Sequence, residues 1–270
     1  DDYFNAKLKL FKMCKKGLVN IDSEYAERVI NNSACGITTF GIEKDADIKA
    51  VNIKKHPNSV EFKVITPEEN EEIKVNIPGT FSVYNALAAI GACYIMGISL
   101  EDVKIGLQNV KVPGRAEVVY AGKEFTIIID YAHSPDSLQN ILSTIKEYAP
   151  GRLVCVFGCG GDRDKTKRPI MGEISGQISD YTIITSDNPR TENPEDIIKD
   201  IEVGIKKTDG AYITIIDRTQ AIKYAIENAK SKDVVVLVGK GHETYQIFKD
   251  KTIHYDEREV VREILKDIRE

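Results

Sequence analysis

The sequence predicts an α/β protein whose C-terminal part is a Rossmann-like, doubly wound and mostly parallel sheet. Three observations lead to this class. Apolar strand patterns alternate with helical patterns along residues 124–270. The segments 152–158 and 233–239 are almost continuously apolar, as parallel strands covered on both faces are. Helix-start signals, a capping residue followed by proline, occur at Ser134-Pro135 and Asn193-Pro194.

The N-terminal part is less regular and predicts a separate domain. A helix is expected over residues 3–14, followed by strands over 34–42, 47–55, 59–66 and 71–77. The last three alternate apolar and polar residues, which indicates half-buried antiparallel strands. After Pro78-Gly79 an apolar helix is expected over 82–96, and Ser99 begins another. Because Pro113-Gly114 is a turn signal, we predict domains over residues 1–113 and 114–270.

The C-terminal domain is predicted to contain five strands, over 124–130, 152–158, 181–186, 211–217 and 233–239. A capping residue, Asp217, begins the helix between the last two strands. A hairpin around Asp250-Lys251 and a final helix after Asp256 complete the domain.

Composition excludes several classes of protein. The chain has 270 residues, 42% of them hydrophobic, and a formal net charge of -5. No apolar run reaches the ~18 residues of a membrane span, and a net acidic chain is untypical of proteins that bind nucleic acid or anionic membranes. Five dispersed cysteines indicate reduced thiols and a cytoplasmic location. The first residues carry no Met and no signal-peptide pattern, so we expect them to lie inside a helix.

Polar clusters follow four of the predicted strands. They occupy residues 130–133, 158–168, 187–190 and 239–243. Ligands of open parallel sheets bind outside the carboxyl ends of the strands, so these clusters predict a site for a small, multiply charged ligand. Its rim is expected to be cationic, through Arg115, Arg163, Lys165, Lys167, Arg168, Arg190 and Lys240.

Other interpretations of these motifs are weaker. A nicotinamide or flavin site is disfavoured because Arg163 stands where a dinucleotide fingerprint needs Gly or Ala. No segment satisfies the Walker A pattern. Zinc is disfavoured because Cys155 lies inside an apolar strand. Arg190 follows a stiffening proline at a strand end, which favours a ligand clamp over an ion pair with Glu192.

The segments DYAHSPDSL, FGCGGDRDKTKRPIMGEIS, TSDNPRTENP and GKGHETYQ occur in this order and together resemble the Mur ligases. PGTFSVYNALAA resembles the end of that family's central ATPase domain, and VPGRAE resembles the hinge into its C-terminal domain. The resemblance covers essentially the whole chain. It implies that residues 1–113 are the trailing part of a central ATP-binding domain and that 114–270 are the domain that binds the amino acid.

The resemblance also implies an ATP-dependent amide ligase of peptidoglycan precursor synthesis, with ATP and Mg²⁺ as cofactors. In the family, the D-glutamyl carboxylate of UDP-MurNAc-L-Ala-D-Glu becomes an acyl phosphate, which the amine of an amino acid attacks. Such chemistry requires the protein to hold anions together and to orient the nucleophile.

Family roles can be carried over to single residues. Asn85 would meet the adenine, Arg115 the ATP phosphates and Asp130 the ribose hydroxyls, with His133 lining the same site. Lys7 would be carbamylated, which provides an oxygen ligand of the kind that Mg²⁺ prefers. The candidate catalytic residues are therefore Lys7, Arg115, Asp130 and His133.

In the family, the motif Asp-Asn-Pro-Arg, here residues 187–190, marks enzymes that add meso-diaminopimelate. The guanidinium of Arg190 would pair with the distal carboxylate of that amino acid and repel the ammonium of lysine. Glu243 would take the distal ammonium. The implied pocket comprises Arg163, Asp187, Asn188, Pro189, Arg190, Gly239 and Glu243. A ligase that adds lysine or lanthionine is the alternative.

The chain departs from the family pattern at its start. The family's phosphate loop and its domain for the uridine nucleotide belong upstream of residue 1, so we expect these residues alone not to catalyse ligation. A sister ligase such as folylpolyglutamate synthase and a non-catalytic nucleotide- or amino-acid-binding module are further alternatives. We expect a monomer without nucleic-acid or membrane partners, whose domains move about Val112 to Arg115.

Overall fold

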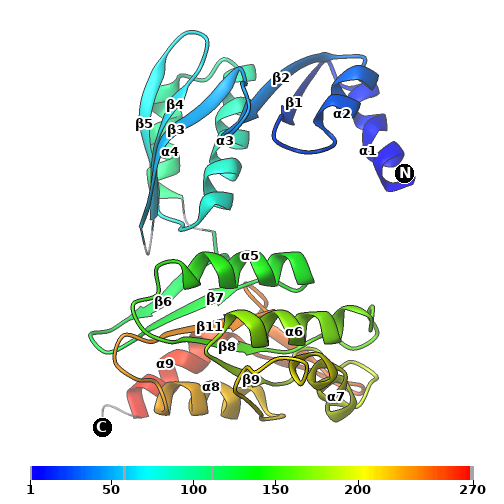
Figure 1. The fold of residues 1–270 in the computed structure, drawn as a ribbon, viewed down its shortest axis with the longest axis vertical. Helices are drawn as coiled ribbons and strands as arrows, with labels where there is room; N and C mark the ends of the chain where they lie inside the picture. Colours follow the sequence, from blue (N-terminus) through cyan, green and yellow to red (C-terminus); the bar gives the residue numbers. More distant parts are fainter. Residues whose placement is uncertain (1, 57–58, 111, 268–270) are drawn as a thin grey trace. The chain divides into compact units, whose positions relative to one another are not determined.

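The computed structural model describes residues 2–56, 59–110 and 112–267, and the chain forms two compact units, Asp1–Lys111 and Val112–Glu270 (Figure 1). The boundary predicted after residue 113 falls two residues inside the second unit. Each unit combines helices with a sheet, which confirms the predicted α/β class. No described helix is both long enough and apolar enough to span a bilayer.

The first unit is built on a five-stranded sheet in the order β1-β2-β3-β4-β5. β1, β2 and β3 pair in parallel, whereas β3, β4 and β5 pair antiparallel, as their alternating sequences predict. The strands are Lys16–Asn20, Gly36–Gly41, Ile48–His56, Ser59–Ile65 and Asn70–Val75. β1 was not predicted, because a five-residue strand that begins Lys-Gly carries little periodicity.

The core of this unit lies between the sheet and a long apolar helix. The unit's helices are α1 (Asp2–Met13), α2 (Ala26–Asn32), α3 (Thr80–Ile95) and α4 (Leu100–Asn109). Phe62 of β4 and Ile73 of β5 belong to one buried cluster with Leu87 and Ile90 of α3. Burial of these side chains is the main stabilising contribution in the first unit.

The second unit is built on a six-stranded sheet in the order β10-β9-β8-β11-β7-β6. All neighbours pair in parallel except β6, which is an antiparallel edge strand on β7. The strands are β6 (Glu117–Ala121), β7 (Thr126–Asp130), β8 (Leu153–Phe157), β9 (Tyr181–Ile184), β10 (Tyr212–Thr214) and β11 (Val234–Val238). The predicted hairpin is present as β12 (Tyr245–Ile247) and β13 (Thr252–His254).

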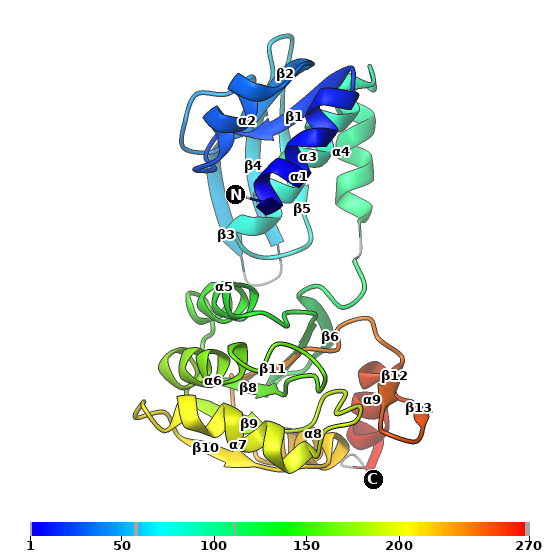
Figure 2. The ribbon, with the colours of Figure 1, turned by 90° about the vertical axis from the view of Figure 1, so that its right-hand side faces the viewer.

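Helices cover both faces of this sheet. They are α5 (Pro135–Lys146), α6 (Lys167–Ile178), α7 (Pro194–Ile205), α8 (Arg218–Glu227) and α9 (Glu257–Asp267). α5 packs on α6 and α6 on α7 along one side, while α8 and α9 pack together (Figures 1 and 2). Side chains of β7, β8 and β11, such as Ile129, Val156 and Leu237, share a core with Ile222 of α8 and Val261 of α9.

Three helices of the second unit, α5, α7 and α8, begin where their capping residues predict. The Ser134 side chain accepts a hydrogen bond from the Ser137 N–H before α5, and that of Asn193 accepts one from the Glu195 N–H before α7. Asp217 accepts one from the Gln220 N–H before α8. Each bond satisfies an otherwise unpaired N–H of the first helical turn, so local sequence determines these starts.

A buried guanidinium joins two strand ends to two helices. Arg218 begins α8, and its Nε donates to Oε1 of Glu257, at the start of α9, over 2.8 Å. Its terminal nitrogens donate to the carbonyl oxygens of Ser186 and Val238 over 3.2 Å and 2.9 Å. These bonds replace the lost hydration of a fully buried charge, and they hold the ends of β9 and β11 in place.

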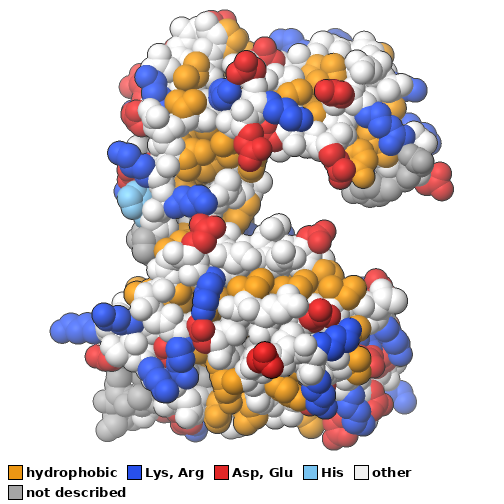
Figure 3. Space-filling model, viewed as in Figure 1, with side chains coloured by type: hydrophobic (Ala, Val, Ile, Leu, Met, Phe, Trp, Pro, Cys, Tyr) orange, Lys and Arg blue, Asp and Glu red, His pale blue; other side chains and the backbone are white. Residues whose placement is uncertain are grey.

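A second buried guanidinium joins α6 to α7 and to the loop before α7. Nη1 of Arg168 donates to Asp200 over 2.9 Å and to Glu192 over 3.0 Å, and Nη2 donates to Glu192 over 2.8 Å. The bond from Arg168 is the main reason that the pKa of Glu192 falls to about 2. Basic and acidic side chains are otherwise mixed over the visible surface of each unit (Figure 3).

Replacement of Arg218 by alanine should lower the free energy of unfolding by about 3–5 kcal/mol, because Glu257 would be left as an unpaired buried charge. Urea denaturation of the chain measures this loss. Arg262→Ala is the matched control, since Arg262 lies exposed on α9. If the two variants lost similar free energies of unfolding, the buried pair of Arg218 and Glu257 would not be the cause of the loss.

Acid stability should depend on Glu192. Its native pKa is lowered, so the stability it contributes is complete above the unfolded carboxyl pKa of about 4.3 and is lost as the pH falls toward about 2. We expect Glu192→Gln to lose less stability over this window than the wild type, measured as Tm against pH. Glu263→Gln, at an exposed position, serves as control. If Tm fell equally with pH in the wild type and in Glu192→Gln, Glu192 would not be a source of the acid sensitivity.

Candidate functional site

The carboxyl ends of β7, β11, β8 and β9 lie side by side at one edge of the second sheet. The four polar clusters predicted from the sequence directly follow these strands. β11 inserts between β7 and β8. The next helix after β11 is α9, which packs with α8, whereas the helices that follow β7 and β8, α5 and α6, lie in the other layer. This reversal creates the kind of crevice in which doubly wound sheets bind ligands.

The loops after β9 and β11 meet in a buried polar cluster. Nδ2 of Asn188 donates to Glu243 over 2.9 Å, and Nζ of Lys240 donates to Oδ1 of Asn188 and to Glu243 over 3.2 Å each. The backbone N–H of Ile247 donates to the same Asn188 oxygen over 3.0 Å. Lys240 is fully buried and Glu243 is 13% exposed, so the cluster presents a carboxylate whose position its neighbours determine.

Arg190 stands beside this cluster in a strained conformation. Its φ is 51°, a value that non-glycine residues rarely adopt. Its backbone N–H donates to the Ile247 carbonyl oxygen over 3.1 Å, and its Nη1 donates to the Gly161 carbonyl oxygen over 2.8 Å. Glu192, the alternative ion-pair partner considered from the sequence, instead binds Arg168 and Lys165. The guanidinium is therefore positioned by backbone groups.

The loop after β8 is held against the loop after β9. The Gly161 N–H donates to the Asn188 carbonyl oxygen over 2.9 Å, and the Thr191 hydroxyl donates to Asp162 over 2.7 Å. A Cβ on Gly161 would lie 1.9 Å from the Pro189 carbonyl oxygen, so only glycine permits this approach. Arg163 extends from this loop into solvent, and its Nη1 donates to the Asp162 carbonyl oxygen over 3.0 Å.

The remaining pocket residues border the same two loops. Asp187 and Gly239 follow the carbonyl groups that Arg218 binds, and Gly239 has a φ of 120°. A Cβ on Gly239 would lie 2.6 Å from Oδ2 of Asp187. The structure therefore brings together Asp187, Asn188, Pro189, Arg190, Gly239 and Glu243, with Arg163 at the outer edge.

A second group of predicted residues surrounds Tyr131. The Asp130 carboxylate accepts hydrogen bonds from the Ala116 and Ala132 N–H groups over 2.8 Å each. Burial nevertheless raises the pKa of Asp130, against the effect of these bonds and of Arg115. The Arg115 guanidinium carbon lies 4.9 Å from the centre of the Tyr131 ring. The rings of His133 and His242 each lie 4.8 Å from that of Tyr131.

A close backbone contact joins this group to the loop after β11. Gly114 has a φ of 70°, and a Cβ there would lie 2.1 Å from the backbone nitrogen of His242. The segment that leads into β6 therefore packs directly on the Gly241-His242 peptide. Gly114 is thus required by this contact as well as by its conformation.

The two other predicted residues lie in the first unit. Lys7 is exposed on α1 and Asn85 is exposed on α3. Within the described residues, no group of three or more His, Cys, Asp or Glu side chains is arranged to hold a metal ion. The described part of the chain therefore does not complete a Mg²⁺ site around Lys7.

The structure corrects the predicted cationic rim at two of its residues. Arg168 and Lys240 are fully buried and bind carboxylates, so they support the loops from within. Tyr131 and His242 lie in the predicted polar clusters but were not among the predicted site residues. The signal that could have found these two residues is their position in the polar clusters that follow β7 and β11.

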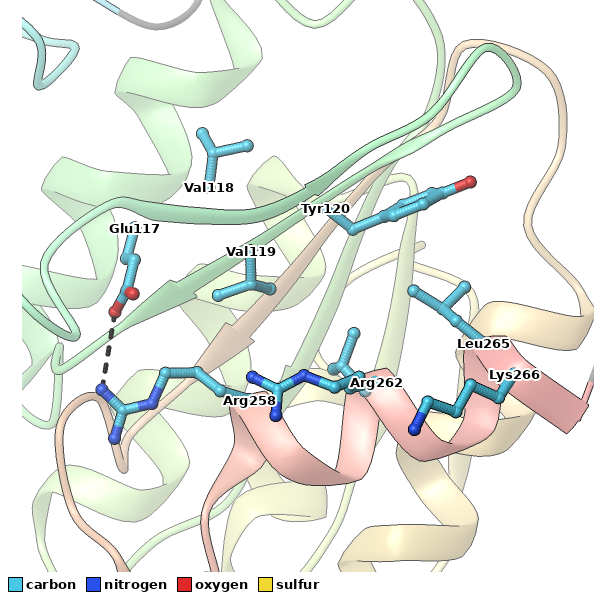
Figure 4. A pocket seen from close by; sticks show the side chains of 9 residues that line it. Glu117, Val118, Val119, Tyr120, Arg258, Arg262, Leu265 and Lys266 are labelled. Carbon is cyan, nitrogen blue, oxygen red and sulfur yellow. Dashed lines mark ion pairs between the residues drawn. The ribbon is translucent and has the colours of Figure 1, made fainter.

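Two of the cavities lined by described residues lie in the second unit. One of about 470 Å³ lies beside Arg190, between the 189–194 loop and the 248–251 turn. The other, of about 520 Å³, lies between β6 and α9, away from the strand ends. Figure 4 shows Arg258, Arg262 and Lys266 along it, with Arg258 3.9 Å from Glu117. Of these two cavities, the one beside Arg190 adjoins the predicted pocket.

Comparison with known proteins places this chain in a family. The profile of the Mur ligase middle domain matches residues 1–93, and that of the Mur ligase glutamate ligase domain matches residues 114–241. A relative from Clostridium botulinum is 51% identical over 99% of this chain, and one from Caldanaerobacter subterraneus is 52% identical over 98%. Both are named UDP-N-acetylmuramoyl-L-alanyl-D-glutamate--2,6-diaminopimelate ligase, and the chain spans 56% and 55% of their lengths.

A solved structure of a ligase with the same name has a TM-score of 0.66 at 32% identity, over 99% of this chain and 57% of that protein. The two profiles together match most of the chain. The gap between them, residues 94–113, contains the boundary between the two units. The chain therefore belongs to the Mur ligase family.

Proposed function

We propose that this chain is part of a cytoplasmic, ATP-dependent amide ligase of peptidoglycan precursor synthesis. The reaction joins meso-diaminopimelate to UDP-MurNAc-L-Ala-D-Glu through an acyl phosphate. The observation that carries the proposal is the position of Arg190 beside the cluster of Asn188, Lys240 and Glu243. The names of the relatives support it. Because the chain spans just over half of their length, we assign to it the amino-acid pocket and part of the nucleotide site.

The pocket offers opposite charges to the two ends of a diamino acid. The planar guanidinium of Arg190 has further N–H groups with which to bind a carboxylate, while Gly161 fixes its direction. Glu243 would bind an ammonium, and Lys240 and Asn188 hold that carboxylate in place. Lysine has an ammonium where diaminopimelate has a second carboxylate, so Arg190 would repel it.

The group around Tyr131 supports a nucleotide role. Asp130 is held by two backbone N–H groups and Arg115 lies over the Tyr131 ring, so a carboxylate and a cation are both positioned at the end of β7. Asp130 would accept hydrogen bonds from ribose hydroxyls, Arg115 would neutralise phosphate charge, and His133 would line the site. In the first unit, Asn85 would contact the adenine. ATP, when bound, supplies the phosphoryl group that activates the carboxylate. Lys7, once carbamylated, would offer one oxygen ligand to Mg²⁺.

The full-length protein that contains this chain should release ADP when it receives ATP, Mg²⁺, UDP-MurNAc-L-Ala-D-Glu and meso-diaminopimelate. We expect little release when lysine replaces diaminopimelate, because lysine lacks the carboxylate that Arg190 binds. A coupled ADP assay with diaminopimelate, lysine and lanthionine measures this preference. Equal use of lysine would exclude the proposed specificity. Absence of ADP release with every diamino acid would favour a non-catalytic binding module.

Arg190→Ala in that protein should lower kcat/KM for diaminopimelate roughly 30- to 5,000-fold. This loss corresponds to about 2–5 kcal/mol of transition-state stabilisation from a charge-assisted contact. Arg190→Lys should recover only part of the loss, since an ammonium lacks the bidentate fork. Arg262→Ala, on α9, controls for removal of an arginine. Unchanged kinetics in Arg190→Ala would remove this residue from the pocket.

A further inference from the structure

Two cysteine thiols of the first unit lie in contact. The Cys14 thiol donates a hydrogen bond to Sγ of Cys35 over 3.3 Å, although 21 positions separate the two residues. Cys14 is exposed and Cys35 is half-buried, so a small reagent can reach the pair. Nothing in the proposed ligase chemistry uses either residue.

The backbone holds this pair from both sides. Cys14 directly follows α1, and Cys35 directly precedes β2. On one side, the parallel register of β1 and β2 pairs Lys16 with Gly36. On the other, the Ala34 N–H donates to the Phe11 carbonyl oxygen over 3.2 Å. The approach of the sulfurs is therefore set by the backbone, and a bond between them would need only a small local movement.

The other cysteines have different environments. Cys155 and Cys159 are fully buried in the second unit, and burial raises the pKa of each to about 12. Cys93 lies half-buried on α3, packed against the core of the first unit. Thiolates are the reactive form of cysteine, so Cys155 and Cys159 should resist reagents that reach Cys14 and Cys35.

We propose that Cys14 and Cys35 form a reversible intramolecular disulfide by exchange with a low-molecular-weight disulfide. The Cys14 thiolate attacks one sulfur of the reagent, forms a mixed disulfide and releases one small thiol. The Cys35 thiolate then attacks the Cys14 sulfur and releases the second small thiol. Two protein thiols are oxidised, and one small disulfide is reduced to two thiols, which take up the two protons.

Exposure determines the order of these steps. Cys14 is the more accessible thiol, and it therefore receives the reagent first. Partial burial and the adjacent Cys14 thiol raise the pKa of Cys35, so resolution by Cys35 becomes faster at alkaline pH. The product closes a loop that contains β1 and α2 and fastens the end of α1 to the first residue pair of the sheet. This proposal is independent of the ligase activity.

Peptide mapping of the full-length protein tests the proposal. The protein is equilibrated in glutathione buffers of increasing oxidised fraction, alkylated and digested with trypsin. Cleavage after Lys12, Lys15, Arg28 and Lys44 leaves Cys14 in peptide 13–15 and Cys35 in peptide 29–44. We expect these two peptides to become linked in oxidising buffer and to separate after reduction, equally in the wild type and in Cys93→Ser.

Single variants distinguish the exchange mechanism from simple thiol modification. In Cys14→Ser or Cys35→Ser, the remaining cysteine cannot be resolved, so a glutathione adduct should accumulate on it. In the wild type, the urea midpoint of the first unit should rise on oxidation, whereas it should not change with redox state in Cys14→Ser. Stable glutathione adducts on wild-type Cys14 without a linked peptide, or a link that forms only between two molecules, would overturn the proposal.

Discussion

The site of the second unit depends on the hydrogen bonds that the buried guanidinium of Arg218 donates. This guanidinium binds the carbonyl groups directly before Asp187 and Gly239, and it joins them to Glu257 at the start of α9. Removal of a charge from water is costly, and three hydrogen bonds offset that cost only when all partners are in place. The ends of β9 and β11 are therefore held in one relative position, from which Asn188 and Glu243 can meet.

Strain at the strand ends has the same consequence. Three of the described non-glycine residues with positive φ lie in segments that border the predicted site, namely Ala116, Asp162 and Arg190; Asn52 and Lys232 lie elsewhere. Three hydrogen bonds hold these conformations: the Ala116 N–H donates to Asp130, the Thr191 hydroxyl donates to Asp162, and Arg190 donates to the Gly161 carbonyl oxygen. Such strain is tolerated where the surrounding bonds over-determine the backbone, and it leaves side chains oriented before a ligand arrives.

Local patterns predicted much of the fold. The uninterrupted apolar segments became the central parallel strands β8 and β11, because both faces of those strands are covered. Ser134, Asn193 and Asp217 begin helices as expected, since capping depends on residues only three positions apart. β1, α2 and the edge strand β6 were not predicted, because each is short and its sequence carries little periodicity.

The sequence by itself determined the family, the α/β class and the polar residue types that follow each strand. Tertiary structure decided which of those residues meet. β11 pairs between β7 and β8, although about 80 to 100 residues separate it from them, and this insertion carries Glu243 to Asn188. It also decided which cations face solvent: Lys240 and Arg168 lie buried against carboxylates, whereas Arg163 is exposed. The physical reason is that charge and periodicity act along the chain, while burial and ion pairing depend on the order in which strands associate.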